Sequence, residues 1–322
     1  MKVARYEKIS DVNTMVNRVY YPEGYLINTV ENQSSIKSKT TLNECMLNGK
    51  ILEGRAIVCD SEHNLIVDLP CMKGVIPRIE GAIGITDGST RDIALISRVN
   101  KPVCFKVIGF STNELGQEYA ILFRRAVQEE CLKDYISQLS SGDIINARVT
   151  HLEQFGCFVD IGCGIPSLIP IDAISVSRIS HPADRFYVNQ DIKTIVKEVC
   201  GNRVWLSHKE LLGTWEENAS LFSAGETVAG IVRSVESYGI FIELTPNLAG
   251  LSEFKEGVTV GQNASVYIKA LIPEKMKVKL VIVDVFNAEY PKAPLDYFVH
   301  DDHIDYWKYT TEVSNKVIET RF

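Results

Sequence analysis

The chain has 322 residues, of which 45% are hydrophobic and 23% are charged, and its mean hydropathy is zero. This composition is typical of a globular protein and excludes the collagen-like, low-complexity and disordered classes. The sequence has no apolar run long enough for a transmembrane helix, and its first residues lack the apolar stretch of a signal peptide. We therefore expect a cytoplasmic protein with no membrane partner.

The formal net charge is −7, from 34 Lys and Arg against 41 Asp and Glu. This excludes a nucleic-acid binder that relies on phosphate neutralisation alone, but not one that stacks bases. The cysteines form no CxxC pair, so we expect reduced, partly buried thiols rather than a zinc site or disulfides. The eight cysteines are Cys45, Cys59, Cys71, Cys104, Cys131, Cys157, Cys163 and Cys200.

Two segments of the chain align without a gap, which indicates duplicated units. The segment that begins at Ser141, SGDIINARVTHLEQFGCFVDIGCGIPSLIP, matches the segment that begins at Ala224, AGETVAGIVRSVESYGIFIELTPNLAGLSE. A weaker third copy begins at Asn48, where LIVDL aligns with CFVDI and GVIP with SLIP. The sequence therefore predicts three related units in tandem.

Each copy contains short runs rich in Val and Ile that are separated by turn residues, which is typical of strands. In the middle copy we expect strands at 143–152 and in CFVDIG, IPSLIP, IKTIVKEV and RVWLSH, with an irregular link at 172–188. In the last copy we expect them near 226–237, 240–244, 248–251, 264–272 and 277–286. Five strands with a long link between the third and fourth suit an OB barrel. The predicted fold is mainly β, with three tandem five-stranded OB-fold barrels joined by short helices.

Helices are expected between the copies. AVQEECLKDYISQL, from Ala126, and KELLGTWEENASLF, from Lys209, both place apolar residues at helical spacing. Ahead of the first copy, Thr41 and Glu44 predict a capping box and Gly49 predicts a helix stop. The expected division is an N-terminal extension, three barrels and a C-terminal tail, at 1–40, 41–128, 139–213, 219–287 and 288–322.

Two aromatic residues, Phe155 and Phe158, lie three apart around Gly156. In a strand, residues three apart point to opposite faces, but a bulge or kink at the glycine would bring both rings onto one surface. Tyr238 and Phe241 repeat this pair in the last copy. On an OB barrel, exposed rings of this kind stack the bases of single-stranded nucleic acid. The alternative is that the rings belong to the core.

The middle copy resembles the S-one (S1) RNA-binding domain family, through SGDIINARVTHLEQFGCFVDIG, IPSLIP and NRVWLSHKEL. The last copy resembles it through YGIFIELTPNLAGLSE, and the first copy is similar to the leading, non-RNA-binding domain of ribosomal S-one proteins. The chain as a whole is similar to the ribosomal S-one-like proteins of low-GC Gram-positive bacteria. The resemblance implies a face for single-stranded RNA. That face uses two aromatics, a His after the third strand, an Asp on the fourth and an Arg opening the fifth.

The resemblance assigns RNA binding to Phe155, Phe158 and Arg203 in the middle copy and to Tyr238, Phe241 and Lys277 in the last. Pro170 stands at the family's His, and Cys200 stands near its Asp. In the last copy Glu253 replaces the His, and in the first copy His63 and Ile66 replace both aromatics. We therefore expect RNA binding chiefly from the middle copy and least from the first.

The middle copy has no overall basic field, because residues 139–213 contain seven Lys and Arg against eight Asp and Glu. RNA binding there would need a local basic patch, and each candidate could instead be an ordinary solvated charge. The candidates are Arg148, Lys193, Lys197, Arg203 and Lys209.

Other motifs carry less chemistry. The HDDHID group at 300–305 could supply metal ligands, but a polar tail is the favoured interpretation, and His181 is expected to cap a loop. The chain has no GxGxxG, P-loop, GxSxG or HExxH motif, so we expect no enzyme activity, no metal and no cofactor.

The favoured function is a cytoplasmic protein that holds single-stranded RNA, with mRNA as the expected ligand, in connection with the small ribosomal subunit and translation. One alternative is a protein-interaction scaffold that uses the first copy and the aromatic, acidic tail YFVHDDHIDYWKY as contact surfaces. Another is an accessory RNA-binding subunit of an RNA-processing complex.

Overall fold

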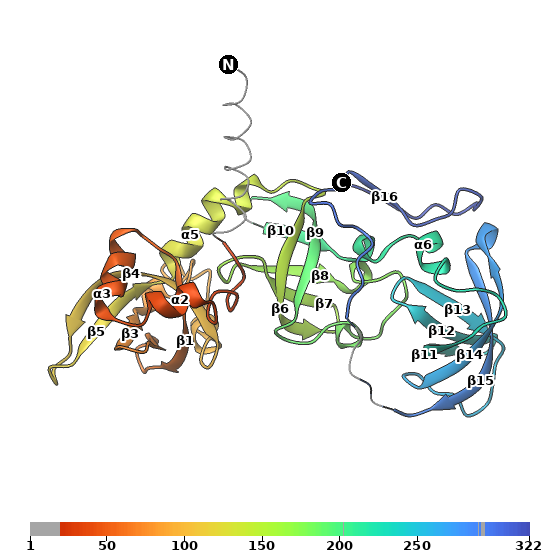
Figure 1. The fold of residues 1–322 in the computed structure, drawn as a ribbon, viewed down its shortest axis with the longest axis horizontal. Coiled ribbons are helices and arrows are strands. Elements are labelled where there is room, and N and C mark those ends of the chain that lie inside the picture. The colour runs from red at the N-terminus through yellow and green to blue at the C-terminus, as the bar shows by residue number, and fades with distance from the viewer. Residues whose placement is uncertain (1–19, 202, 289, 291–293) are drawn as a thin grey trace, which may run out of the picture. The chain divides into compact units, whose positions relative to one another are not determined.

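The computed structural model of the protein describes residues 20–201, 203–288, 290 and 294–322 (Figure 1). Three closed barrels of five strands each follow one another along the chain, which confirms the predicted fold class. The chain divides into two compact units. The first unit is Met1–Leu139 with Asp160–Pro166, and the second is Ser140–Val159 with Ser167–Phe322.

The first barrel has the strand order β1-β2-β3-β5-β4. Alternate residues of its strands point inward, and Leu65, Val67 and Phe105 are fully buried. Three helices accompany it: α2 (Val30–Ser35), α3 (Lys39–Leu47) and α4 (Ile93–Ile96). Its strands are β1 (Leu52–Cys59), β2 (Leu65–Asp68), β3 (Lys73–Ile76), β4 (Pro102–Thr112) and β5 (Glu118–Phe123).

Helix α3 begins one residue after Ser38, so the capping box predicted at Thr41 and Glu44 is wrong. The Ser38 hydroxyl accepts from the backbone N–H of Thr41 at 3.2 Å, and the Thr41 hydroxyl accepts from the N–H of Ser38 at 3.2 Å. Ser38 has the extended backbone that an N-cap needs. The predicted stop at Gly49 is confirmed, because this residue has φ +59° just after the helix.

The middle barrel has the order β10-β8-β7-β6-β9. Its core contains the fully buried Val149, Val159 and Ile169. The irregular link between β8 and β9 contains two short 3-10 helices, and the predicted capping role of His181 is confirmed, because its Nδ1 accepts from the Ala183 N–H at 3.0 Å. The strands are β6 (Ile144–Glu153), β7 (Gly156–Asp160), β8 (Pro166–Pro170), β9 (Asp191–Cys200) and β10 (Arg203–Ser207).

The predicted helix between the first two barrels is present as α5 (Arg125–Asp134). The single helix predicted from Lys209 is wrong, since the segment forms a 3-10 turn, Lys209–Leu212, and then the separate helix α6 (Trp215–Ala219). Gly213, at φ +82°, divides the two, and Thr214 caps α6. Glycine adopts this left-handed backbone without steric cost, which explains why the helical pattern stops here.

The last barrel repeats the topology of the first, in the order β11-β12-β13-β15-β14. Its core combines inward residues of the strands, such as Val232 and Ile242, with Trp215 of α6. The strands are β11 (Thr227–Glu236), β12 (Gly239–Thr245), β13 (Leu248–Ser252), β14 (Asn263–Ile272) and β15 (Lys277–Phe286).

The C-terminal tail, for which the sequence predicts no fold, packs within the second unit and forms β16 (Tyr306–Lys308) and β17 (Glu319–Arg321) (Figure 1). Trp307 and Tyr309 are 5% and 6% exposed and belong to the core of the last barrel. The Tyr309 hydroxyl donates to the Asn247 carbonyl at 2.6 Å. Interpreting these two rings as an exposed contact surface is therefore wrong. Burying them removes large apolar areas from water.

The HDDHID group also has a structural role. The backbone N–H of Ile144 donates to the Asp302 carbonyl at 2.9 Å, and the N–H of Ile304 donates to the Gly142 carbonyl at 3.0 Å. His303 lies 2.7 Å from Asp143 through Nδ1, and this hydrogen bond raises the pKa of the imidazole. Within the described part of the chain, no group of three or more His, Cys, Asp or Glu side chains is arranged to hold a metal ion.

All eight cysteines are free thiols, of which five are buried and Cys71 and Cys200 are exposed. Among the residues that the structure describes, no helix has the length and apolar character needed to cross a membrane.

Candidate nucleic-acid interface

The two aromatics of the middle barrel meet at the β6–β7 hairpin. Phe155 stands in the two-residue turn and is 57% exposed, whereas Phe158 is half-buried on β7. Their ring centroids lie 5.9 Å apart with an interplanar angle of 90°, an edge-to-face pair. The prediction that both rings share one surface is confirmed. Phe155 reaches this surface from the turn that precedes Gly156, and not from within a strand.

Gly156 is needed for a different reason. A Cβ at this position would lie 2.5 Å from the Ile169 carbonyl oxygen and 3.0 Å from Leu168 Cδ1. Real Cβ atoms do not approach a backbone oxygen so closely, so the glycine allows β8 to pack against the start of β7. Gly239 has the same role in the last barrel, where a Cβ would lie 2.5 Å from the Ser252 carbonyl oxygen.

The last barrel repeats the aromatic pair. Tyr238 lies in the turn between β11 and β12 and is 68% exposed, and Phe241 is half-buried on β12. Their centroids are 6.2 Å apart at 85°. The middle and last barrels thus each present one exposed ring that packs against a second, half-buried ring.

The first barrel has no such pair at the equivalent positions. Ile66 pairs with Val58 and Val75, as Phe241 pairs with Ser234 and Leu251, so the alignment of Ile66 with the second aromatic is confirmed. His63 has φ +63° in the wider turn before β2. The first barrel therefore offers an aliphatic side chain where the other two offer a ring.

Arg203 and Lys277 occupy equivalent positions, as the alignment predicts. Each is the first residue of the fifth strand of its barrel, and each is exposed. Two residues later, Trp205 pairs with Leu168 and Lys279 pairs with Leu251. Both cations are therefore exposed at equivalent positions of their barrels, where they can contact phosphate.

Two more of the basic candidates, Arg148 and Lys193, lie on the β6–β9 pair. The Arg148 guanidinium contacts both carboxylate oxygens of Asp191, at 2.6 and 2.9 Å, and its side chain is 18% exposed. Lys193 is half-buried on β9, opposite Asn146 of β6. Their RNA-binding roles remain predictions, and Arg148 could bind phosphate only while sharing or leaving its carboxylate.

Sequence interpretation missed two further side chains of the middle barrel. His151, on β6, has its ring 6.5 Å from that of Phe158. Trp205 is 41% exposed on β10, although its neighbours Val204 and Leu206 are buried. The in–out alternation of RVWLS could have identified Trp205 as an outward residue. Of the family positions that differ, Pro170 ends β8, and Cys200 is exposed at the end of β9.

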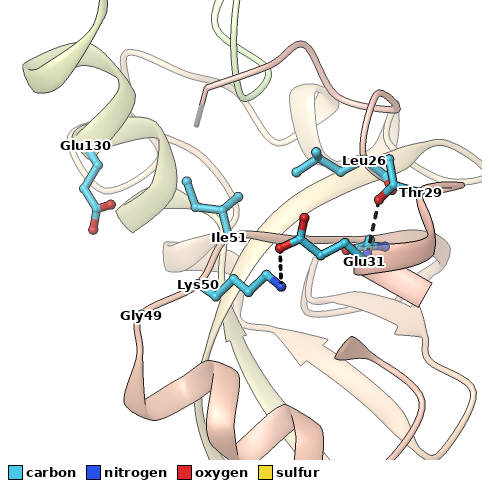
Figure 2. Close-up of a pocket in the computed structure, with 8 residues that line it drawn as sticks. Leu26, Thr29, Glu31, Gly49, Lys50, Ile51 and Glu130 are labelled. Atoms are coloured by element: carbon cyan, nitrogen blue, oxygen red, sulfur yellow. Dashed lines mark hydrogen bonds and ion pairs between the residues drawn. The ribbon is translucent and has the colours of Figure 1, made fainter. Parts of the chain in front are cut away.

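A pocket of about 280 Å³ lies elsewhere, in the first unit (Figure 2). Two pairs of its lining residues bond to each other: Lys50 forms an ion pair with Glu31 at 2.8 Å, and Thr29 accepts a hydrogen bond from the N–H of Asn32 (Figure 2). The pocket contains none of the predicted RNA-binding residues.

A buried charge cluster in the first unit is also structural. Glu23 accepts two hydrogen bonds from Arg124, at 2.6 and 2.9 Å, while its own N–H donates to Asp160 at 2.7 Å. Burial alone would raise the pKa of Glu23, but Arg124 lowers it to about 2. Burial and the Glu23 charge raise the pKa of Asp160 to about 7. These groups are bonded to one another, and Asp160 lies on β7 two residues after Phe158.

The middle barrel matches a known protein family. Residues 138–209 match the family model described as the S1 RNA binding domain. This segment contains Phe155, Phe158, Arg203 and Trp205. The resemblance predicted from the sequence is confirmed.

Longer similarity extends to ribosomal proteins of low-GC Gram-positive bacteria. Small ribosomal subunit protein bS1 of Staphylococcus aureus is 28% identical over 259 residues, which covers 76% of this chain and 63% of that protein. The bS1 homolog of Bacillus cereus is 32% identical over 196 residues, which covers 57% of this chain and 50% of the homolog. The chain thus spans less than two thirds of the length of these relatives.

Two solved structures are also similar. A multidomain protein with nucleic acid binding domains from Streptococcus pneumoniae is 13% identical, with a TM-score of 0.25 over 73% of each chain. GSP13 of Bacillus subtilis is 19% identical, with a TM-score of 0.21 over 22% of this chain and 55% of that chain. TM-scores of this size do not establish a shared arrangement of domains.

Proposed function

We propose that this chain binds single-stranded RNA on the aromatic faces of its middle and last barrels, and chiefly on the middle one. The observation that carries the proposal is the exposed ring of Phe155, set edge-to-face against Phe158 within the segment that matches the S1 RNA binding domain.

The mechanism follows from the geometry of the pair. A base stacks on the exposed ring of Phe155, and Phe158 supports that ring from the side. Stacking of this kind contributes about 1–3 kcal/mol per base and tolerates any base, since every base has a π-face. Arg203 supplies a phosphate contact on the fifth strand, and its fork can pair with two phosphate oxygens. In the last barrel, Tyr238 with Phe241 and Lys277 make the weaker, second site.

We further propose that the protein works in the cytoplasm with the small ribosomal subunit, on mRNA, as a binding protein without enzyme activity or cofactor. The named function of the Staphylococcus and Bacillus relatives supports this role. The scaffold alternative is less well supported, because the tail residues Trp307 and Tyr309 are buried and cannot present a contact surface.

The test is a titration of the full chain with an unstructured RNA of about ten nucleotides, alongside a duplex of the same length. We expect binding to the single strand, weak binding to the duplex, and a loss of at least tenfold in affinity for the Phe155→Ala, Tyr238→Ala double variant. Equal affinity for both RNAs, or an unaffected double variant, would contradict the proposal.

A further inference from the structure

Trp205 differs from the other two tryptophans of the chain in its exposure. Trp215 and Trp307 are 3% and 5% exposed and belong to the core of the last barrel, whereas Trp205 is 41% exposed. A single exposed ring is common on a protein surface, so exposure alone assigns no role to Trp205. Its position on the barrel indicates which ligand it meets.

The strands place Trp205 on the same outward surface as the aromatic pair. Val204 and Leu206 point into the barrel, so Trp205 and Arg203 both point out. Trp205 lies opposite Leu168 of β8, and β8 lies between β10 and β7, the strand of Phe158.

The first and last barrels show which residues lie side by side across the strands at the position of Trp205. In the last barrel Phe241 pairs with Leu251, and Leu251 pairs with Lys279. The repeat alignment equates Phe158 with Phe241 and Leu168 with Leu251. By this alignment, the residues side by side across the second, third and fifth strands are Phe158–Leu168–Trp205 in the middle barrel. They correspond to Ile66–Val75–Ile121 in the first barrel and to Phe241–Leu251–Lys279 in the last.

The spacing between strands allows an extended RNA strand to contact Phe158 and Trp205 in turn. Neighbouring strands lie about 4.8 Å apart, so two spacings set Trp205 about 10 Å from Phe158 across the surface. An RNA strand that crosses β7, β8 and β10 meets the aromatic pair first and then the indole. Arg203, two residues from Trp205 on the same face, is available for the phosphate that accompanies this base.

We propose that Trp205 is a third base-stacking residue of the middle barrel, so that this barrel holds one more base than the last. In the last barrel Lys279 occupies the same position, is exposed, and contacts phosphate instead of a base. The inference rests on the proposed function and extends it, since Trp205 is an outward position of this chain's own β10. It predicts that the middle barrel prefers a longer single strand than the last.

Tryptophan fluorescence tests this directly, because Trp205 is the exposed one of the three indoles. The full chain is titrated with a ten-nucleotide oligouridylate while emission and acrylamide quenching are followed. We expect stacking to quench the solvent-accessible emission and to protect it from acrylamide. The Trp205→Phe variant should lose this signal yet keep its affinity within about threefold, because phenylalanine also stacks. Trp205→Ala should lose about tenfold in affinity.

Tyr306→Ala is the matched control, because Tyr306 is 45% exposed but lies on β16 in the tail. It should bind RNA like the wild type. Unchanged acrylamide quenching on saturation with RNA, with a Phe155-dependent affinity that Trp205→Ala leaves intact, would overturn the role of Trp205 and leave the proposed function standing. A wild type that binds no RNA overturns both. The fluorescence of the wild type gives a result even if Trp205→Ala fails to fold.

Discussion

Arg185, in the link between β8 and β9, donates to both carboxylate oxygens of Glu243 on β12, through Nη1 at 2.7 Å and through Nη2. Both side chains are about 95% buried, at 4% and 6% exposure. Arg233 of β11 contacts the same carboxylate at 2.9 and 3.1 Å and reaches Asp184 at 3.2 Å. Glu243 therefore contacts two arginines, Asp184 supplies the second negative charge, and the network joins the middle barrel to the last within the second unit.

Glu243→Gln should destabilise the protein by about 3–5 kcal/mol, because it leaves two largely buried guanidinium groups with Asp184 as the remaining anion of this network. Chemical denaturation measures the loss. Glu236→Gln, at an exposed position of β11, is the matched control and should change stability by less than about 0.5 kcal/mol. Similar effects of the two variants would show that the network contributes nothing beyond a surface charge.

Phe155→Ala should reduce RNA affinity much more than fold stability. The ring is 57% exposed, so little burial is lost, while one stacked base is removed at about 1–3 kcal/mol. Phe186→Ala, at a fully buried ring, should do the opposite and cost about 3–5 kcal/mol of folding free energy. Thermal melting and RNA titration of both variants separate the two effects. A large drop in melting temperature for Phe155→Ala, with unchanged affinity, would place this ring in the core.

Two neighbouring residues of β16 test whether the tail contributes to the stability of the fold. Trp307 is 5% exposed in the core of the last barrel, and Tyr306 is 45% exposed. Trp307→Ala should cost about 3–5 kcal/mol, and Tyr306→Ala about 1 kcal/mol or less. Urea denaturation monitored by far-UV circular dichroism compares them without relying on tryptophan emission. Two equal, small losses would mean that the tail is not part of the fold.

RNA binding should depend only weakly on salt. The chain carries a net charge of −7, and Arg148 is paired with Asp191, so few cations are available. With roughly three to five phosphate contacts at about −0.7 each, the slope of log affinity against log salt is expected near −2 to −3.5. Titrations between 50 and 300 mM salt, at roughly five concentrations, measure it. A slope steeper than about −5 would indicate an extended basic track.

His208 should make stability depend on pH. It is buried between the rings of Phe186 and Tyr297, at 5.0 and 5.7 Å, and burial lowers its pKa to about 4. The unfolded chain takes up this proton near pH 6.5, before the folded chain does, so stability is lost as pH falls from about 6.5 to 4. The full shift corresponds to about 3 kcal/mol.

Other buried groups act in the opposite direction, so the measurement compares His208→Asn with the wild type. Burial raises the pKa of Glu53 and of Asp160 to about 7, and these carboxyls favour the folded state as pH falls below that value. Subtracting the variant's pH profile from that of the wild type removes their contribution. Parallel profiles between pH 4 and 6.5 would show that His208 does not titrate differently on folding.

Much of the fold is predictable because each strand carries its own signal. The alternation of Val and Ile with polar residues defines the strands of the middle and last barrels. The repeat alignment correctly equates Ile66 with Phe241, since the two residues pair with equivalent positions of the neighbouring strands. The start of α3 was missed because two capping patterns lie three residues apart, and only the extended backbone of Ser38 decides between them. Local sequence does not contain that choice.

The rest depends on contacts between residues that are distant in sequence. Arg148 looks like a free cation in the chain, but Asp191, 43 residues away, lies opposite it on the next strand. Trp307 is buried because the tail packs against the core of the last barrel, and no local sequence pattern indicates this packing. Trp205 was overlooked for another reason, since matching to family positions passes over outward residues that the family does not specify.

The hydrogen bond from Glu23 to Asp160 bears on how the protein emerges from the ribosome during its own synthesis. The two residues are 137 positions apart, so Asp160 is made roughly 7–27 s after Glu23 at ordinary elongation rates of about 5–20 residues per second. The last strand of the first barrel ends at Phe123, so the strands of this barrel are complete before Asp160 is made, while the N–H of Glu23 still lacks its buried acceptor. A nascent chain must therefore extend through β7 before the first unit can close around its amino-terminal segment.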